Sequence, residues 1–409
     1  MGEKTQHSII EKLSEICQAF KGRAAGTEAE RNCQQYFCDE LNQYADDAVV
    51  EEFDVHPRAF MGWIFPVSIL ALISIACFWM RLLSHAIIWP VIGGVCITIA
   101  CIVALFEFLL YIQFIDVFFP KKRSSNVFAR RAPSGELKRR IVFCGHTDAA
   151  YEMTYVLHHG RKNIIRIAHA AMIGLAYVFV VNIIAMIIAL TRGGILITGI
   201  WLAAGIGELV FIPIFIDIMF FVNWFCIVDG ANDNLSGCLV AMGVLEDMAK
   251  RGIRMKNTEV CCLLTGSEEA GLRGSTAFAK KHRRDFDDVE TIFVVLDTLR
   301  EIEHMQVYTR GINGLQANSK RVSKLIVNAA QNCGVTLKEA MPYPGATDAE
   351  AFSRAGFEAS AMCGINHDPR PYYHTRYDTP DNVDTECIML AHDIAMEIAT
   401  LYDEEGLPR

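Results

Sequence analysis

Histidine and carboxylate side chains of the kind that bind divalent metal ions recur at five places along this 409-residue chain. Most of them follow short apolar runs, where an acid or an imidazole is costly to bury unless it shares a partner. Two histidines and several carboxylates, with no cysteine among them, favour a hydrolytic site for zinc or another divalent ion. A carboxylate that bridged two ions would let them hold both the attacking and the leaving oxygen. The candidate residues, in chain order, are His146, Asp148, Asp233, Glu268, Glu269, Asp297 and His374.

Predicted strands that alternate with predicted helices would position these residues. Apolar runs with the length and composition of buried strands occupy residues 141–144, 259–264, 291–296 and 359–363. Helices are predicted at residues 236–251, 275–284, 318–333, 348–355 and 385–402. This order is typical of an α/β fold with a mixed, mostly parallel central sheet flanked by helices. Ligands of such sheets bind beyond the carboxyl ends of the strands, which is where the candidate residues lie.

The N-terminal part of the chain contributes further elements. Helices are predicted at residues 8–20 and, after a capping box formed by Thr27 and Glu30, up to about residue 44. A strand is predicted at residues 49–53. Two more apolar runs flank the turn Pro133-Ser134-Gly135, and this pattern predicts a β-hairpin of residues 127–130 and 140–144.

Four long apolar stretches interrupt the alternating pattern. They cover residues 60–80, 86–106, 167–191 and 193–228, and about 20 apolar residues suffice for a helix to cross a lipid bilayer. We therefore expect two transmembrane hairpins, at residues 58–120 and 161–228, that anchor the protein in the membrane. Residues 1–57, 121–160 and 229–409 are then expected to form one catalytic domain. Glu208 lies inside the fourth apolar stretch and Glu107 directly follows the second, and the pattern leaves open whether they function in the membrane or only lie near its surface.

The distribution of basic residues near the ends of the spans predicts the orientation of the protein. Cytoplasmic flanks carry an excess of lysine and arginine. The hairpin tips carry only Arg81 and Arg192. The flanks on the side of the catalytic domain carry Arg58, Lys121, Lys122, Arg123, Arg161, Lys162 and Arg166. The catalytic domain is therefore predicted to be cytoplasmic.

Composition excludes several classes of protein. The chain has 38 lysine and arginine residues against 47 aspartate and glutamate residues, so it lacks the basic excess with which proteins bind nucleic acid. Hydrophobic residues make up 52% of the chain, which excludes disorder as its main character. The 14 cysteines are scattered, several of them within apolar runs, and we expect them to be free thiols in a reducing compartment.

Six sequence blocks resemble, in the same order, motifs of the two-zinc aminopeptidases, metallopeptidase family twenty-eight. The resemblance covers nearly all of the polar sequence, although most familiar members of that family lack the apolar insertions. The blocks are Gly22-Arg23-Ala24-Ala25-Gly26-Thr27, His146-Thr147-Asp148, residues 230–237, residues 268–275, Gly345-Ala346-Thr347-Asp348 with Phe352 and Gly356, and residues 374–381.

The resemblance implies a role for each metal-binding candidate. Asp233 would bridge two divalent ions, expected to be zinc. His146 and Asp297 would complete the ligands of one ion, and Glu269 and His374 those of the other.

The resemblance also implies catalytic roles. Glu268 would act as the general base that takes a proton from a metal-bridging water, and Asp148 would orient the ligand His146. Tyr373 is a candidate oxyanion donor or a packing residue. The expected activity is hydrolysis of the N-terminal peptide bond of short peptides by a membrane-embedded aminopeptidase.

Three alternatives stay open at this point. The same fold could carry a one-zinc glutaminyl cyclase, which is an acyltransferase, or a scaffold without catalysis. A transporter is a third alternative, but four spans are few for that function. The complete set of ligand types argues against a scaffold. The substrate preference, the native metal and the oligomeric state are not predicted.

Overall fold

The computed structural model describes residues 2–193, 199–366 and 372–409. The chain divides into two compact units. The sheet unit comprises Met1–Pro57, Pro120–Glu152 and Trp224–Arg409, and the helical unit comprises Arg58–Phe119 and Met153–Asn223. The helical unit therefore contains the first three apolar stretches and the fourth up to Asn223, and it interrupts the sheet unit twice along the chain.

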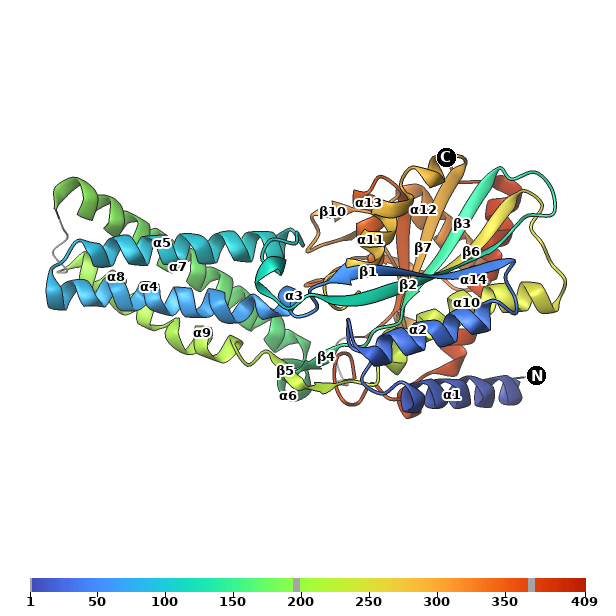
Figure 1. Ribbon diagram of the computed structural model, residues 1–409, viewed down its shortest axis with the longest axis horizontal. Coiled ribbons are helices and arrows are strands. Elements are labelled where there is room, and N and C mark those ends of the chain that lie inside the picture. Colours follow the sequence, from blue (N-terminus) through green and yellow to red (C-terminus); the bar gives the residue numbers. More distant parts are fainter. Residues whose placement is uncertain (1, 194–198, 367–371) are drawn as a thin grey trace. The chain divides into compact units, whose positions relative to one another are not determined.

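The sheet unit is built on an eight-stranded sheet with the order β1-β2-β6-β3-β7-β12-β8-β11 (Figure 1). Its four central strands, β6, β3, β7 and β12, are mutually parallel, whereas β1, β2 and β8 join the sheet through antiparallel pairs. The predicted α/β class with a mixed, mostly parallel sheet is confirmed. The strands are β1 (Asp47–Val55), β2 (Lys122–Arg131), β3 (Arg139–His146), β6 (Thr258–Thr265), β7 (Glu290–Leu299), β8 (Met305–Tyr308), β11 (Lys338–Ala340) and β12 (Glu358–Gly364).

Helices cover both faces of this sheet. One face packs against α1 (Gly2–Ala19), α2 (Glu28–Leu41), α10 (Ser236–Lys250), α12 (Lys320–Asn332) and α14 (Thr385–Glu405). The other face packs against α11 (Arg273–His282) and α13 (Asp348–Arg354). The helices predicted after residue 230 all form, with ends that differ by a few residues.

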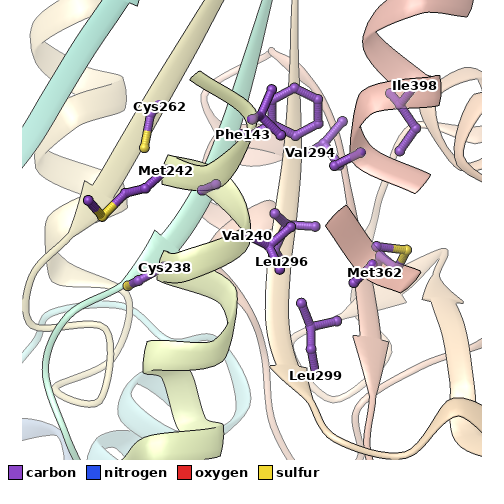
Figure 2. Packing of buried hydrophobic residues seen from close by; sticks show 14 of the residues in the cluster. Phe143, Cys238, Val240, Met242, Cys262, Val294, Leu296, Leu299, Met362 and Ile398 are labelled. Carbon is purple, nitrogen blue, oxygen red and sulfur yellow. The ribbon is translucent and has the colours of Figure 1, made fainter. Parts of the chain in front are cut away.

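The core of the sheet unit explains why the central strands are apolar throughout. Successive side chains of a strand point to opposite faces, so Phe143 faces one layer of helices and Cys144 faces the other. Figure 2 shows the larger layer, in which Phe143 and Leu296 of the sheet lie among side chains of α10 and α14. A strand covered on both faces needs no polar alternation.

The predicted hairpin of residues 127–130 and 140–144 is wrong. β6 lies between β2 and β3 and pairs with both of them. All eight residues of β6 are buried, so this strand needs a neighbour at each edge. The turn around Ser134 instead bonds to the segment that leads into β6, where the Ser134 N–H donates to the Met255 carbonyl at 2.8 Å.

The predicted capping box at Thr27 forms only in part. The Thr27 hydroxyl accepts a hydrogen bond from the Glu30 N–H at 3.2 Å. The Glu30 carboxylate, however, accepts from the Gly26 N–H rather than from the N–H of Thr27. A complete capping box forms between Thr347 and Glu350 at the start of α13. This capping box was not predicted from the sequence.

The helical unit contains four helical segments that are long and apolar enough, by length and composition, to cross a membrane. They are Ala59–Arg81, Ile88–Leu109, Lys162–Arg192 and Ile200–Ile218. The secondary-structure elements of this unit are α3 (Ala59–Gly62), α4 (Ile64–Ser84), α5 (Ile88–Ala104), a π-helical turn (Leu105–Leu109), a 3-10 turn (Asp116–Phe118), α6 (Thr154–His159), α7 (Arg161–Arg192), α8 (Ile200–Leu209) and α9 (Ile212–Ile218). Residues 194–198, at the predicted tip of the second hairpin, lie outside the described residues.

The fourth apolar stretch is not one continuous helix up to residue 228. α8 ends at Leu209, and α9 begins next to Pro213, whose ring has no N–H to continue the helical hydrogen bonds. Beyond α9, residues Val222–Ile227 form β5, which pairs with β4 (Tyr151–Met153). An apolar run does not by itself distinguish a strand from a helix.

The two glutamates of the apolar stretches have partners within the helical unit. The Glu107 carboxylate accepts hydrogen bonds from the N–H groups of Phe114 and Ile115 at 2.8 and 2.9 Å, so it stabilises the turn after the second apolar helix. Glu208 of α8 accepts a hydrogen bond from the side-chain amide of Asn182 of α7 at 2.6 Å. The side chains of Asn182 and Glu208 are fully buried.

Candidate metal centre

Three neighbouring strands bring most of the candidate ligands to one edge of the sheet. His146 is the last residue of β3, Asp297 lies near the end of β7, and the Glu268-Glu269 pair follows the end of β6 at Thr265. Because β6, β3 and β7 are adjacent and parallel, their carboxyl ends meet at the same edge. The predicted position of the site beyond the strand ends corresponds to this arrangement.

Two further candidates come from loops. Asp233 lies in the turn Ala231–Leu235 directly before α10, and His374 lies in the segment after β12. The two oxygens of the Asp233 carboxylate face different imidazoles: Oδ1 lies 3.1 Å from His146 Nε2, and Oδ2 lies 2.9 Å from His374 Nε2. Asp233 therefore lies between the two histidines, as a bridging ligand must.

The remaining carboxylates complete a ring of donor atoms. Glu269 Oε1 lies 3.1 Å from His374 Nε2. Asp297 Oδ1 and Glu268 Oε2 lie 4.0 and 3.9 Å from His146 Nε2. Among the described residues, three triads offer ligand atoms within 4.8 Å of one another: His146-Asp233-Asp297, Asp233-Glu269-His374 and His146-Glu268-Glu269. The first two contain the same residues as the two ligand sets that the resemblance implies, with Asp233 shared.

The residues present fit a pair of divalent cations. Asp233 Oδ2 and Glu269 Oε1 are buried and share one close neighbour, His374 Nε2, at 2.9 and 3.1 Å, without accepting a well-formed hydrogen bond. A single ring nitrogen cannot donate to both oxygens, and a buried acceptor that is not satisfied is costly. Nitrogen and oxygen donors from histidine and carboxylates, without thiolate, suit zinc in a hydrolytic site.

The pKa values of the residues at this site reflect the negative charge of the carboxylates gathered there. Burial raises the pKa of Glu268 well above its ordinary value, although His146 opposes this shift. Burial and the Asp233 carboxylate raise the pKa of Asp297 to about 7. Burial lowers the pKa of His374, but the neighbouring carboxylates outweigh it and raise this pKa to about 10. Protons thus compensate the clustered carboxylates where no cation does so.

Asp148 contacts the loop of the glutamate pair. Its two carboxylate oxygens accept hydrogen bonds from the backbone N–H groups of Glu268 and Glu269 at 2.9 and 3.0 Å. His146 Nδ1 lies closer to the Asp148 carbonyl oxygen, at 3.1 Å, than to its carboxylate, at 3.6 Å. The expected contact with His146 is therefore made chiefly by the backbone of Asp148, and its side chain holds the next loop.

Tyr373 lies against one of the histidines. Its ring stacks on the imidazole of His374 with a centroid distance of 3.9 Å and an interplanar angle of 19°. Burial and the surrounding carboxylates raise the pKa of the Tyr373 phenol well above its ordinary value. The phenol therefore keeps its proton and is able to act as a hydrogen-bond donor.

Asp378 and Asn234 hold the turn of Asp233. Both residues lie within the motif blocks, but the resemblance assigned no role to them. Asp378, fully buried, accepts hydrogen bonds from the N–H of Asn232 at 2.8 Å and from the N–H of Asp233 at 3.1 Å. The Asn234 side chain donates to the Leu296 carbonyl at 2.8 Å and so ties the turn of Asp233 to β7. Their position within those blocks was the only signal for them in the sequence.

A comparison with protein families adds independent evidence. Residues 216–399 match the model of peptidase family M28. The M28 match includes Asp233, Glu268, Glu269, Asp297 and His374, and it begins after His146. No curated protein matches the chain at a significant level.

Solved structures extend this similarity from the M28 region to the fold. The aminopeptidase from Aneurinibacillus sp. strain AM-1 is 14% identical with a TM-score of 0.56, and the alignment covers 97% of this chain and 93% of that chain. A zinc aminopeptidase from Bacillus subtilis is 13% identical with a TM-score of 0.56, and the alignment covers 98% of this chain and 95% of that chain. The glutaminyl cyclase of Fimbriiglobus ruber is 13% identical with a TM-score of 0.55, and the alignment covers 97% of this chain and 95% of that chain. At these identities the similarity establishes the aminopeptidase-like fold.

Proposed function

We propose that the protein is a membrane-embedded, two-zinc aminopeptidase that removes N-terminal residues from short peptides. The observation that carries this proposal is the placement of Asp233 between two triads of nitrogen and oxygen donors. This placement occurs on a fold shared with a zinc aminopeptidase. The M28 match over residues 216–399 supports the same class of reaction.

Each protein group has a separate task in the proposed hydrolysis. His146, Asp233, Glu269, Asp297 and His374 would hold two zinc ions, which when bound polarise the peptide carbonyl and acidify water. Glu268 takes a proton from the attacking water and later gives it to the amine that leaves.

Two further side chains would assist this reaction. Asp148 fixes the backbone of Glu268, because its carboxylate accepts the Glu268 N–H. Tyr373 stays protonated and lies beside His374, so its hydroxyl is available to donate to the oxygen that gains negative charge in the transition state.

The metal content of the purified protein tests the centre itself. We expect two zinc ions per chain by mass spectrometry at saturating zinc. Activity on aminoacyl fluorogenic amides should disappear with a chelator and return when zinc is restored. A protein that binds one ion or none would contradict the two-ion centre.

The four apolar helices support a multi-pass membrane protein, and the basic flanks support a cytoplasmic catalytic domain. Exposed cysteines introduced at Ser134 and at Ser84, in a background without other accessible thiols, test this orientation. An impermeant thiol reagent on intact cells should label the cysteine at position 84, at a hairpin tip, and miss the one at position 134. The reverse labelling pattern would place the sheet unit outside the cell.

A glutaminyl cyclase is the second candidate, because one shares the fold with nearly the same TM-score. A peptide with N-terminal glutamine distinguishes the two reactions by mass spectrometry. An aminopeptidase releases free glutamine and a shortened peptide. A cyclase releases ammonia and leaves a full-length peptide with a cyclised N-terminus.

A further inference from the structure

The second interruption of the sheet unit separates two of its metal-ligand loops. The chain leaves the sheet unit at Glu152 and returns to it at Trp224. The loop that carries His146 lies before this interruption, and the loop that carries Asp233 lies after it. The pairing of β4 with β5 brings the two ends of the interruption together. Further contacts within the sheet unit then fix the two ligand loops, which lie beyond this pair of strands.

Arg23 connects these two loops directly. Its Nε donates a hydrogen bond to the Thr147 carbonyl at 3.0 Å, in the loop of His146. Its Nη2 donates to the carbonyls of Asp229 at 2.6 Å and Gly230 at 3.2 Å, in the loop of Asp233. The Arg23 side chain is 1% exposed, and the Ala149 N–H in turn donates to the Arg23 carbonyl at 2.9 Å.

Glu30, on the same segment, reaches the third ligand loop. Its buried carboxylate accepts hydrogen bonds from the N–H and the hydroxyl of Ser267 at 2.8 and 3.1 Å. Ser267 directly precedes the Glu268-Glu269 pair. Gln34 adds a bond from its side-chain amide to the Thr147 hydroxyl at 3.0 Å. One short segment therefore contacts three of the ligand-bearing loops, those of His146, Asp233 and the Glu268-Glu269 pair.

We propose that Arg23, Glu30 and Gln34 form a positioning clamp for the metal centre and that Arg23 is its principal residue. The clamp links the loops of His146, Asp233 and the Glu268-Glu269 pair through hydrogen bonds within the sheet unit. Its catalytic consequence rests on the proposed function, but its effect on the metal ligands does not depend on which bond is cleaved.

The geometry of Arg23 requires a guanidinium rather than any cation. A guanidinium offers a rigid fork of donors, so it bonds to carbonyls on two loops at once. No carboxylate of the described residues forms an ion pair with Arg23, and its described partners on the two loops are backbone carbonyls. An ammonium group at this position would bond to one loop and leave the other without its donor.

The test uses the full-length protein in detergent and three variants. Arg23→Met removes the clamp, and Arg23→Lys keeps the charge without the fork. Arg31→Met is the matched control, because Arg31 lies on the same segment but, among the described residues, donates hydrogen bonds to the carbonyls of Thr27 and Arg123, at 3.2 and 3.1 Å, outside the ligand loops. The measurements are the rate of zinc release to a chromogenic chelator, kcat and KM, and rescue by millimolar guanidinium.

We expect Arg23→Met to release zinc at least about tenfold faster than the unchanged protein, the size of effect that loss of an outer-sphere partner has on metal affinity. Its kcat should fall while KM changes little, and guanidinium should restore part of both properties. Arg23→Lys should be intermediate, and Arg31→Met should resemble the unchanged protein. A merely structural role would lower thermal stability without a response to guanidinium.

The outcomes of these experiments test the clamp and the proposed function separately. A folded Arg23→Met protein with unchanged zinc release and kcat overturns the clamp, and so does an equal loss in Arg31→Met. If Arg23→Met does not fold, unchanged zinc release in Arg23→Lys overturns the clamp. If the protein binds zinc but cleaves no peptide, the peptidase proposal fails while faster zinc release in Arg23→Met still supports the clamp. A protein that binds no zinc overturns both.

Discussion

Replacement of Glu268 by glutamine is expected to lower peptide turnover by about 10²- to 10⁴-fold, the usual contribution of a general acid-base residue. The amide has the shape of the carboxylate but cannot accept the proton. Glu268 Oε2 lies 3.9 Å from His146 Nε2, within reach of the ligand cluster. The backbone of residue 268 should remain held by Asp148, because that contact uses the N–H group.

Zinc content and peptide binding should therefore survive in Glu268→Gln. Mass spectrometry of the metal-loaded variant and inhibition by a slowly cleaved peptide measure the two properties. Glu303→Gln, the same change at an exposed position, is the control and should retain full turnover. Near-normal turnover in Glu268→Gln would remove Glu268 from the role of general base.

Replacement of Asp233 by asparagine should have a different result, in which zinc and activity are lost together. Asp233 is the residue whose two oxygens face both histidines, at 3.1 and 2.9 Å. An amide offers one oxygen and no negative charge, so it cannot bridge two cations. The affinity for zinc should fall by more than the roughly 10- to 100-fold that loss of an outer-sphere partner costs.

Zinc per chain after dialysis, measured beside peptide turnover, tests this expectation. Asp39→Asn, the same change on an exposed part of α2, should keep both zinc and activity. An Asp233→Asn protein that keeps two zinc ions would show that Asp233 does not bridge them. Together the variants at positions 233 and 268 separate the loss of metal from the loss of the base.

The sequence by itself determined the local features of this protein. Apolar runs such as residues 260–264 identified the central strands, because a strand buried on both faces has no polar side. The long apolar stretches identified the helices that could cross a membrane. The types and order of residues such as His146, Asp233 and His374 identified a candidate metal centre, because few side chains combine in this way without a cation.

Only the tertiary structure decided which segments lie side by side. β6 inserts between β2 and β3, although those two strands are closer in sequence and flank a turn pattern. Local patterns report which face of a segment is buried, whereas the choice of partner strand depends on contacts across the whole chain. The same limit explains why the apolar stretch up to residue 228, predicted as part of a transmembrane hairpin, contains the strand Val222–Ile227.

The contacts of the site also depend on the tertiary structure. Nothing in the local sequence indicates that Arg23 donates to carbonyls on both sides of the helical insertion, or that Asp378 accepts the N–H of Asp233. A motif shows which residue types accompany a site. The hydrogen bonds that position the ligands join residues more than one hundred positions apart, and only the folded chain brings them within 3 Å.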